Sequence, residues 1–320
     1  MFFSIIIPVY NRPDELRELL ESLSLQDNSH FEVIVVDDGS ELKADQICQQ
    51  FQNSLDLHYF FQENTGQGFA RNRGMKAGKG DFFVMFDSDV IVPPAYFSKL
   101  ENAIKNRGLD AFGGPDAAAT DFSTSQKAMD FAMTSFWTTG GIRGKMKDPA
   151  KFQARGFNMG VSREVFEKIG GFIDPNQGED IEWSLRIKKA GFKLELVQEA
   201  FVFHKRKNSL WSFAKQAFSF GRNRINVSRF HPEAIQVVHL LPSLFVVFLI
   251  SLVLSGMLGW KLFYLQSVVF GFWVVGVFLS VTFQTKSLPV GILAILASIL
   301  QLSAYGVGFI WEFLIKLFKG

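Results

Sequence analysis

The sequence has little cysteine and little charge. Its one cysteine, Cys48, cannot form a disulfide within the chain and cannot supply a cysteine cluster for a metal. Charged residues make up only 20% of the chain, whereas hydrophobic residues make up 48%, a balance that excludes an intrinsically disordered protein. The formal net charge is only +2. This value argues against a nucleic-acid binder, so we expect no nucleic-acid partner.

Charge is almost absent from the C-terminal part of the chain. After residue 239 the only ionised side chains are Lys261, Lys286, Glu312, Lys316 and Lys319. The three uncharged stretches that they leave each exceed the roughly 20 residues that a helix needs to cross a membrane. We therefore predict three transmembrane helices, near residues 239–260, 262–284 and 289–312. A buried helical hairpin in a soluble core is the alternative, but successive uninterrupted apolar spans are rare in soluble proteins.

The distribution of basic residues predicts which side of the membrane the first domain occupies. Residues 186–229, which lead into the first span, contain eleven Lys and Arg residues against two acidic ones. Basic flanks face the cytoplasm, and the first ten residues do not resemble a secretory signal. We therefore expect a cytoplasmic domain over residues 1–230 and a multi-pass domain over residues 231–320, in the plasma or inner membrane. The basic Lys316 and Lys319 conflict with an odd number of spans, so a tilted, interfacial or re-entrant third segment stays open.

Residues 1–230 alternate between short apolar runs and amphipathic segments. Strands are predicted at residues 3–9, 31–36, 57–61 and 81–86, and helices at residues 13–25, 40–47 and 66–77. Strands that alternate with helices over short links form a mainly parallel α/β sheet. In such sheets ligands bind beyond the carboxyl ends of the strands.

Acidic pairs follow the second and fourth predicted strands. Asp37 and Asp38 follow the second strand, and Asp87 and Asp89 flank Ser88 directly after the fourth. Two carboxylates at this spacing can hold a hard divalent cation that keeps water and phosphate oxygens as its other ligands. Taken alone, such a pair is more often a solvated turn or a helix cap.

Three further segments accompany these acidic pairs along the chain. They are Pro8-Val9-Tyr10-Asn11, Asn64-Thr65-Gly66 and Ala70-Arg71-Asn72-Arg73-Gly74. Together with the acidic pairs, they resemble the family 2 glycosyltransferases over residues 3–220. The resemblance implies a GT-A fold, in which a Rossmann-like, mainly parallel sheet carries the active site. It also implies transfer of a sugar from a nucleotide donor.

The resemblance implies a nucleotide site at four of these positions: Pro8, Tyr10, Asn11 and Asp38. Asp38 would accept a hydrogen bond from the base. Arg71 would lie near the diphosphate and the donor sugar. A UDP-sugar is favoured as the donor because uridine diphosphate is the family's commonest carrier.

The resemblance also implies a metal site. Asp87 would face the ribose and the metal, and Asp89 would bind Mg²⁺ or Mn²⁺ directly. His204 follows an apolar strand predicted at residues 200–203, and in several family members a histidine at this place reaches the metal or the diphosphate. A structural or surface histidine beside the basic run 205–207 is an equal alternative for His204.

The acceptor side of the site is implied by segments farther along the chain. Residues 156–160, Gly-Phe-Asn-Met-Gly, resemble the family's lining of the sugar pocket, which places Asn158 there. Glu179 and Asp180 open a helix predicted at residues 180–190, where a carboxylate is favourable in any case. Within the resemblance, Asp180 is the general base that removes the proton of the acceptor hydroxyl in an inverting transfer.

These features predict a membrane-anchored, metal-dependent inverting glycosyltransferase that acts on a hydroxyl of a lipid-linked or cell-envelope glycan and contacts membrane lipids. Transfer to polyprenyl phosphate is the alternative, because an ionised phosphate needs no general base. A non-catalytic membrane binding or assembly protein is a further alternative, although the intact acidic residues argue against it. Residues 216–220 lack the Gln-x-x-Arg-Trp segment of processive polysaccharide synthases. The helix expected at residues 209–224 is rich in Trp and Phe, which favours an interfacial position.

Overall fold

The chain forms two compact units. A computed structural model describes residues 1–117, 123–139, 152–204 and 209–319. The first unit comprises Met1–Ala119 and Asp148–Lys205, and the second comprises Thr120–Lys147 and Arg206–Gly320. The second unit therefore combines the C-terminal helices with a segment from the middle of the chain. It begins before residue 230 because helix α9 (Leu210–Val227) packs along the last helix, α12 (Leu288–Lys319).

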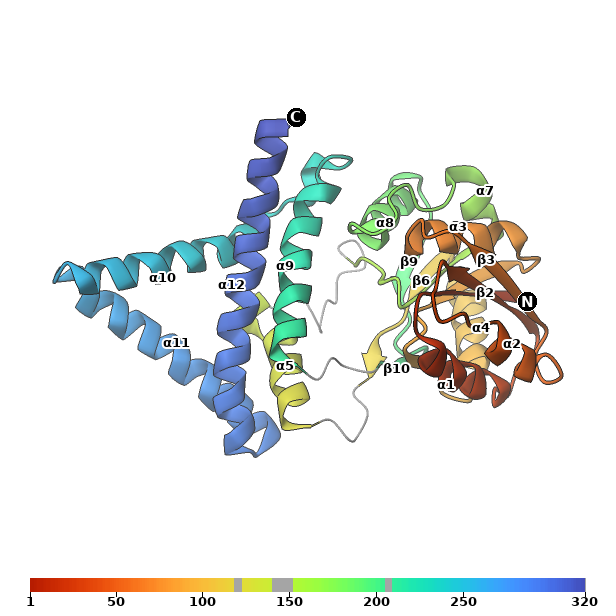
Figure 1. The fold of residues 1–320 in the computed structure, drawn as a ribbon, viewed down its shortest axis with the longest axis horizontal. Coiled ribbons are helices and arrows are strands. Elements are labelled where there is room, and N and C mark those ends of the chain that lie inside the picture. The colour runs from red at the N-terminus through yellow and green to blue at the C-terminus, as the bar shows by residue number, and fades with distance from the viewer. Residues whose placement is uncertain (118–122, 140–151, 205–208, 320) are drawn as a thin grey trace. The chain divides into compact units, whose positions relative to one another are not determined.

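A seven-stranded mixed sheet forms the centre of the first unit (Figure 1). Its strands are, in spatial order, β3 (Leu57–Gln62), β2 (Phe31–Asp38), β1 (Phe3–Val9), β4 (Phe82–Phe86), β8 (Asn158–Ser162), β6 (Ala111–Gly113) and β9 (Leu194–Leu196). Only β8 runs antiparallel to its neighbours within the described sheet. β1 is buried along its whole length, as its apolar sequence predicts for a central strand. The mainly parallel α/β fold expected from the sequence is confirmed.

Helices cover both faces of this sheet. One face packs against α1 (Pro13–Ser24), α2 (Asp45–Phe51) and α4 (Tyr96–Arg107), and the other against α3 (Gln67–Ala77), α7 (Arg163–Ile169) and α8 (Glu179–Lys189). Ile5 and Ile7 point into the first layer, whereas Ile6 points into the second. This alternation follows from the strand geometry, in which successive side chains point to opposite faces.

One helix begins later than its sequence predicts. α2 starts at Asp45 rather than beside Ser40. The Ser40 N–H donates a hydrogen bond to Oδ1 of Asp37, and the Ser40 hydroxyl accepts one from the N–H of Asn11. Ser40 therefore connects two strand ends instead of capping a helix.

A small second sheet lies next to the acidic pair after β4 in the chain. It consists of β5 (Val90–Ile91), β10 (Val202–His204) and β7 (Asp116–Ala117), with β10 in the middle. β10 runs antiparallel to β5, and His204 is opposite Val90. This register brings the backbone of residue 204 beside the residue that directly follows Asp89.

The described part of the second unit is helical. It contains α5 (Thr124–Thr134), α6 (Phe136–Thr139), α9, two short 3₁₀ turns (Pro232–Ala234 and Val237–Leu240), α10 (Leu241–Met257), α11 (Leu262–Thr285) and α12. α10, α11 and α12 are long and apolar enough to cross a membrane, as predicted. The most apolar stretches of α10 and α11 are only 6% and 11% buried, whereas that of α12 is 44% buried. α12 is therefore the helix around which this unit packs.

Glycines allow α9 and α12 to approach each other closely (Figure 1). A Cβ atom at Gly221 of α9 would collide with the carbonyl oxygen of Tyr305, and one at Gly308 of α12 would collide with that of Phe218. Small residues at such crossings are typical of helices that pack in membranes.

Ion pairs hold the end of α12 to α9. Glu312 accepts a hydrogen bond from Nε of Arg222 (2.8 Å) and another from Nη2 of Arg229 (3.0 Å). Lys316 donates to the hydroxyl of Ser228 (3.0 Å). α12 continues beyond its predicted end at residue 312, and both Glu312 and Lys316 are paired there.

Candidate active site

The residues implied to bind the nucleotide lie at one edge of the large sheet. β1 pairs in parallel with both β2 and β4, and Asn11, Asp38 and Asp87 stand at or just beyond the carboxyl ends of these strands. Pro8 is buried within β1, whereas Tyr10, just after the strand, is 50% exposed. The fold therefore gathers these positions at the edge where α/β sheets bind ligands.

Asn11 ties the end of β1 to the loop after β2. Its backbone is left-handed, with φ at 53°, a conformation that asparagine tolerates better than most residues. Its N–H donates to Ser40 Oγ (2.8 Å), and its Oδ1 accepts the N–H groups of Glu41 (2.8 Å) and Leu42 (3.2 Å). Asn11 thus sets the shape of both loops.

Asp38 organises the loop between β3 and α3. Its Oδ1 accepts the N–H of Thr65 (3.0 Å) and Nε2 of Gln62 (2.7 Å), and its Oδ2 accepts the N–H of Gly66 (2.8 Å). The carboxylate is 3% exposed. Asp38 therefore joins the ends of β2 and β3 and positions the start of α3.

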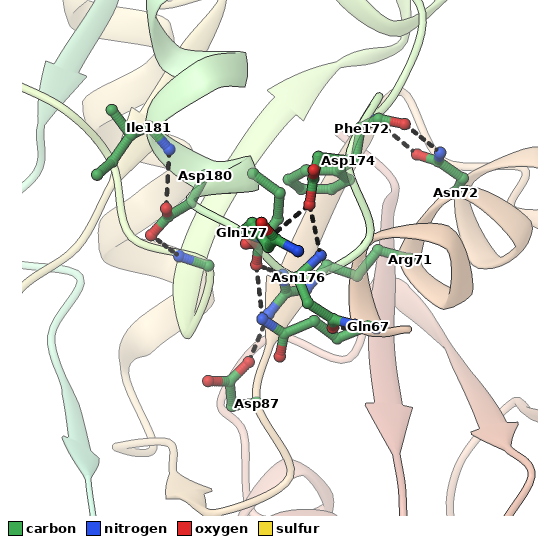
Figure 2. A network of polar contacts seen from close by, with 12 residues as sticks. Gln67, Arg71, Asn72, Asp87, Phe172, Asp174, Asn176, Gln177, Asp180 and Ile181 are labelled. Atoms are coloured by element: carbon green, nitrogen blue, oxygen red, sulfur yellow. Dashed lines mark hydrogen bonds and ion pairs between the residues drawn. The ribbon is translucent and has the colours of Figure 1, made fainter. Parts of the chain in front are cut away.

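Arg71 of α3 bridges two acidic residues from distant parts of the chain (Figure 2). Its Nη2 donates to Oδ1 of Asp87 (2.6 Å), and its Nη1 donates to Oε1 of Glu179 (3.2 Å). The side chain is only 1% exposed. Burial lowers the pKa of Arg71, but the charges of Asp87, Glu179 and Asp180 outweigh this effect and raise it above its ordinary value. Arg71 is therefore a fixed, charged bridge between the end of β4 and the start of α8.

α3 also holds the loop that leads into α8. Asn72 pairs with the backbone of Phe172, since its Oδ1 accepts the Phe172 N–H (2.8 Å) and its Nδ2 donates to the carbonyl (2.7 Å). The N–H of Gln67 donates to Oδ1 of Asn176 (3.1 Å). Asp174 accepts the N–H groups of Asn176 and Gln177 within this loop, as Figure 2 shows.

Glu179 is nearly fully buried beside charged groups. Its Oε1 accepts hydrogen bonds from Nε2 of Gln67 (2.6 Å) and Nη1 of Arg71 (3.2 Å). Burial, and after it the negative charge of Asp180, raises the pKa of Glu179 to about 7, although Arg71 acts in the opposite direction. A carboxyl group that titrates near neutral pH within a polar cluster is typical of an active site.

Asp180 lies half-buried on the first turn of α8. Gly178, just before the helix, is left-handed with φ at 80°. Oδ2 of Asp180 accepts the N–H of Gly156 (3.3 Å), and Oδ1 accepts the N–H of Ile181 (2.8 Å). The first turn of a helix is a favourable position for an acidic side chain, and this one is partly exposed.

Asn158 connects strand β8 to two other parts of the first unit. It is fully buried in β8, its Nδ2 donates to the carbonyl of Ala200 (2.9 Å), and its Oδ1 accepts the Tyr96 hydroxyl (2.5 Å). Burial raises the pKa of Tyr96, so this hydroxyl remains a donor. Both ends of the Asn158 amide therefore hold parts of the unit together.

Asp89 contacts a different arginine from the one that Asp87 contacts. Nη1 of Arg12 lies 2.6 Å from its Oδ2, and the two side chains are 43% and 18% exposed. Arg12 directly follows Asn11 and precedes α1. The second acidic residue of the pair thus contacts the loop after β1, whereas Asp87 contacts Arg71.

A family model for glycosyl transferase family 2 matches residues 4–170. The chain belongs to this family. This family 2 glycosyltransferase is 27% identical to glycosyltransferase AglE of Haloferax volcanii over 234 residues, which cover 71% of this chain and 74% of AglE. It is 26% identical to hyaluronan synthase of Pasteurella multocida over 236 residues, which cover 63% of this chain but only 24% of the synthase.

A solved structure resembles the fold of this glycosyltransferase over nearly its whole length. It is the mannosyltransferase PcManGT from Pyrobaculum calidifontis, solved in complex with GDP-Man and Mn²⁺. The TM-score is 0.68 at 17% sequence identity, and the match covers 97% of this chain and 87% of PcManGT. At this identity the likeness establishes a shared GT-A architecture that includes the C-terminal helices.

The residues after β4 fit the divalent metal that the family resemblance implies. Asp87 and Asp89 both offer carboxylate oxygens, which Mg²⁺ and Mn²⁺ prefer as ligands. The guanidinium of Arg12 already places a positive charge at Asp89. The side chain of His204 and the basic run 205–207 lie outside the described residues, so a metal contact of His204 remains a prediction. Its backbone position opposite Val90 is compatible with that prediction.

A second group of possible metal ligands lies at the opposite ends of the strands. Glu32, Asp56 and His58 each offer one ligand atom, and these atoms lie within 4.8 Å of one another. Glu32 and His58 are near the amino ends of β2 and β3. Nε2 of His58 is 3.3 Å from Asp56 and 3.7 Å from Glu32, which makes an ion pair when the imidazole is protonated. The group is therefore separate from Asp38 and Asp87 and is not the metal site that the sequence predicts.

Three residues of the site were not predicted from the sequence. Arg12, Gln67 and Glu179 contact predicted site residues or one another. Two of them could have been found from their position in the sequence, because Arg12 follows Asn11 and Glu179 precedes Asp180. Gln67 carries no such signal, since it is recognised only from its contact with Glu179.

Proposed function

We propose that this protein is a membrane-anchored, metal-dependent inverting glycosyltransferase that moves a sugar from a nucleotide sugar to a hydroxyl of a lipid-linked or cell-envelope glycan. The observation that carries the proposal is the buried bridge that Arg71 forms between Asp87 and Glu179. It supports a site whose donor side, at the end of β4, is held at a fixed position relative to its acceptor side, at the start of α8. Family membership supports glycosyl transfer, and the three apolar helices support anchoring.

On the donor side, Pro8, Tyr10, Asn11 and Asp38 form the site of the nucleotide base. Asp38 is 3% exposed and both its oxygens accept hydrogen bonds from the protein, which favours a positioning role for its side chain. Asp87 and Asp89 would hold Mg²⁺ or Mn²⁺, and His204 would be a further ligand. The bound metal supplies Lewis acidity that offsets the charge of the departing diphosphate. A UDP-sugar is the favoured donor, and PcManGT, which has GDP-Man in its structure, makes a GDP-sugar the second donor to be tested.

On the acceptor side, Asp180 accepts the proton of the acceptor hydroxyl as its oxygen bonds to the anomeric carbon. The bond from that carbon to the diphosphate oxygen breaks on the opposite face, and the nucleoside diphosphate leaves with the electron pair. The configuration at the anomeric carbon is thereby inverted. The burial of Arg71 and Asn158 favours a positioning role for both over the direct donor contact that the resemblance implies.

We also propose that the catalytic residues act on the cytoplasmic side of the plasma or inner membrane, where membrane lipids and a lipid-linked acceptor meet the enzyme. In this topology the first unit is cytoplasmic and α10, α11 and α12 lie in the bilayer. The basic residues before the first span support this orientation. Sealed inside-out vesicles test it, because added protease should cleave the exposed catalytic part. Protection of that part would contradict the orientation.

The function is tested by Asp180→Asn in the full chain. The amide keeps the size of the side chain but cannot accept a proton as a carboxylate does. Because a positioned general base contributes about 10²- to 10⁴-fold, we expect kcat to fall by roughly 10²-fold or more. Nucleotide affinity should change little. Asp14→Asn is the matched control, since Asp14 is also an acidic residue in the first turn of a helix but is exposed.

Turnover is measured as release of nucleoside diphosphate from UDP- and GDP-sugars with Mn²⁺ or Mg²⁺. Near-normal turnover in Asp180→Asn, with an unaffected Asp14→Asn control, would contradict a hydroxyl acceptor. It would favour polyprenyl phosphate, which is already ionised and gains nothing from a base. Absence of metal-dependent nucleotide binding in the wild-type protein would contradict catalysis itself and favour a binding or assembly role.

A further inference from the structure

The backbone around Arg12 is fixed by hydrogen bonds, whereas its side chain is partly exposed. The preceding residue, Asn11, is anchored on both sides by hydrogen bonds to Ser40 and Glu41. The carbonyl of Arg12 accepts the N–H of Leu16 in the first turn of α1. In contrast, the guanidinium reaches across to Oδ2 of Asp89 at 2.6 Å, and the side chain is 43% exposed. The guanidinium can therefore change partners without any change in the backbone.

We infer that Arg12 is a displaceable cation of the donor site. Its guanidinium contacts Asp89 in this structure, and it would contact phosphate oxygens of the nucleotide instead when Asp89 holds a divalent metal. The inference rests on the proposed function, because it assumes that Asp89 is a metal ligand. It adds a residue that would bind the diphosphate and would compete with the metal for Asp89.

The geometry of the pair makes the exchange feasible. The structure gives one short contact between Arg12 and Asp89 rather than a two-pronged one. Partly exposed pairs of this kind are weak because water and salt screen them. A divalent cation carries twice the charge of a guanidinium, so it competes well for the same carboxylate oxygen. A guanidinium is also well shaped to bind phosphate oxygens, to which it donates parallel hydrogen bonds.

The other arginine of the site cannot make this exchange. Arg71 is 1% exposed and contacts both Asp87 and Glu179, which lie on different elements. Its movement would leave two carboxylates without their buried partner, which is strongly unfavourable. Arg71 is therefore a fixed partner of Asp87, whereas Arg12 is an exchangeable partner of Asp89.

Binding measurements on the full chain in detergent test the inference, with Arg12→Gln as the variant. Mn²⁺ alone is titrated by the electron paramagnetic resonance signal of the free ion. UDP and GDP are titrated by calorimetry at saturating Mn²⁺. Arg17→Gln is the matched control, since Arg17 also lies on the α1 side of the site but contacts Gln50 rather than a carboxylate.

The two titrations should move in opposite directions. Removal of a weak competing pair should tighten Mn²⁺ binding by about two- to five-fold. Loss of a charge-assisted contact to phosphate should weaken binding of the nucleoside diphosphate by about ten-fold. Uridine and guanosine, which lack phosphate, should bind equally to wild type and variant. Arg12→Lys should keep part of the diphosphate affinity, because a lysine retains the positive charge but lacks the parallel N–H donors of a guanidinium.

Three outcomes overturn the inference. Unchanged affinities for both Mn²⁺ and the nucleotides would make Arg12 a surface ion pair only. Tighter Mn²⁺ with unchanged diphosphate binding would contradict transfer to the phosphates. Weaker Mn²⁺ binding would mean that Arg12 supports the metal site rather than competing with it. Failure of the proposed function is distinguishable from all three, because wild-type protein would then bind neither Mn²⁺ nor nucleotide.

Discussion

Nη2 of Arg71 lies 2.6 Å from Oδ1 of Asp87, in a position where the arginine side chain is almost completely excluded from solvent. The same guanidinium contacts Glu179, 108 residues farther along the chain. Buried charges are tolerated only when they are well paired. The end of β4 and the start of α8 are therefore coupled, and a change at either carboxylate is felt by the other through Arg71.

Arg71→Met should destabilise the first unit. The substitution leaves Asp87 and Glu179 without their buried cation, and breaking a buried pair in this way typically costs about 3–5 kcal/mol. The double variant Arg71→Met/Glu179→Gln should recover part of this loss, because an amide at position 179 does not need a buried cation. Thermal unfolding of the purified variants measures the effect. A single variant as stable as wild type would show that the bridge is not a structural element.

Asp89→Asn should abolish metal-dependent nucleotide binding. An amide is a poor ligand for a hard cation in comparison with a carboxylate, and Asp89 is the proposed direct ligand. Calorimetry with UDP and GDP, with and without Mn²⁺, measures the loss. Glu63→Gln removes an exposed carboxylate from the neighbouring β3–α3 loop and serves as the control. Unchanged metal dependence in Asp89→Asn would rule out this residue as the ligand.

Glu179→Gln should alter how stability depends on pH. The folded-state pKa of Glu179 is raised from 4.5 to about 7, so the folded protein binds an extra proton between these values. The stabilisation from that proton is fully present below pH 4.5 and is lost as pH rises through 7. By linkage the whole change is roughly 3 kcal/mol.

The glutamine variant lacks this proton, so the stability of wild type relative to Glu179→Gln should fall from about pH 4.5 to pH 7 and then level off. Unfolding midpoints of both proteins across this range measure the difference. Glu164→Gln, in an exposed pair with Lys168, should show no such trend. A difference that is constant with pH would contradict the raised pKa.

Gly221→Leu should disrupt the packing of α9 on α12. Even the first side-chain carbon at this position would collide with the carbonyl oxygen of Tyr305, which is backbone and cannot rotate away. We expect a loss of about 1–3 kcal/mol, as is typical of overpacking. Gly271→Ala in α11 is the control, because a Cβ there meets no atom within 4 Å. Equal unfolding midpoints for Gly221→Leu and wild type would contradict the close crossing.

The elements that could be predicted from the sequence are those whose signal is local. β1, β2, β3 and α3 have the predicted positions to within two residues, because buried strands and amphipathic helices show their pattern in a short window. The start of α2 was wrong because the hydroxyl of Ser40 bonds to Asn11, 29 residues away. Short strands such as β5 and β7 have too few residues to show a pattern.

The sequence predicted only those site residues that belong to motifs of the family. The strand-end carboxylates and Asp180 could be named because the motifs of the family contain them. The partners that connect them could not, since the contact of Arg12 with Asp89 spans 77 positions and depends on how side chains pack. Burial was equally hidden from the sequence, and it changes the roles proposed for Arg71 and Asn158.

Between β7 and β8 the chain leaves the first unit and contributes a segment to the second. This segment matters for the preparation of a water-soluble enzyme. A stop codon near residue 230 would remove α10, α11 and α12 but would leave α5 and α9 in place, and both of these helices pack against α12. The apolar face of α5, which includes Met129 and Phe131, packs in a cluster with Val290 and Ala294 of α12. A shortened gene product would expose that face and aggregate. A soluble version therefore requires a stop before α9 and a second edit, in which a short polar linker replaces the segment that contains α5.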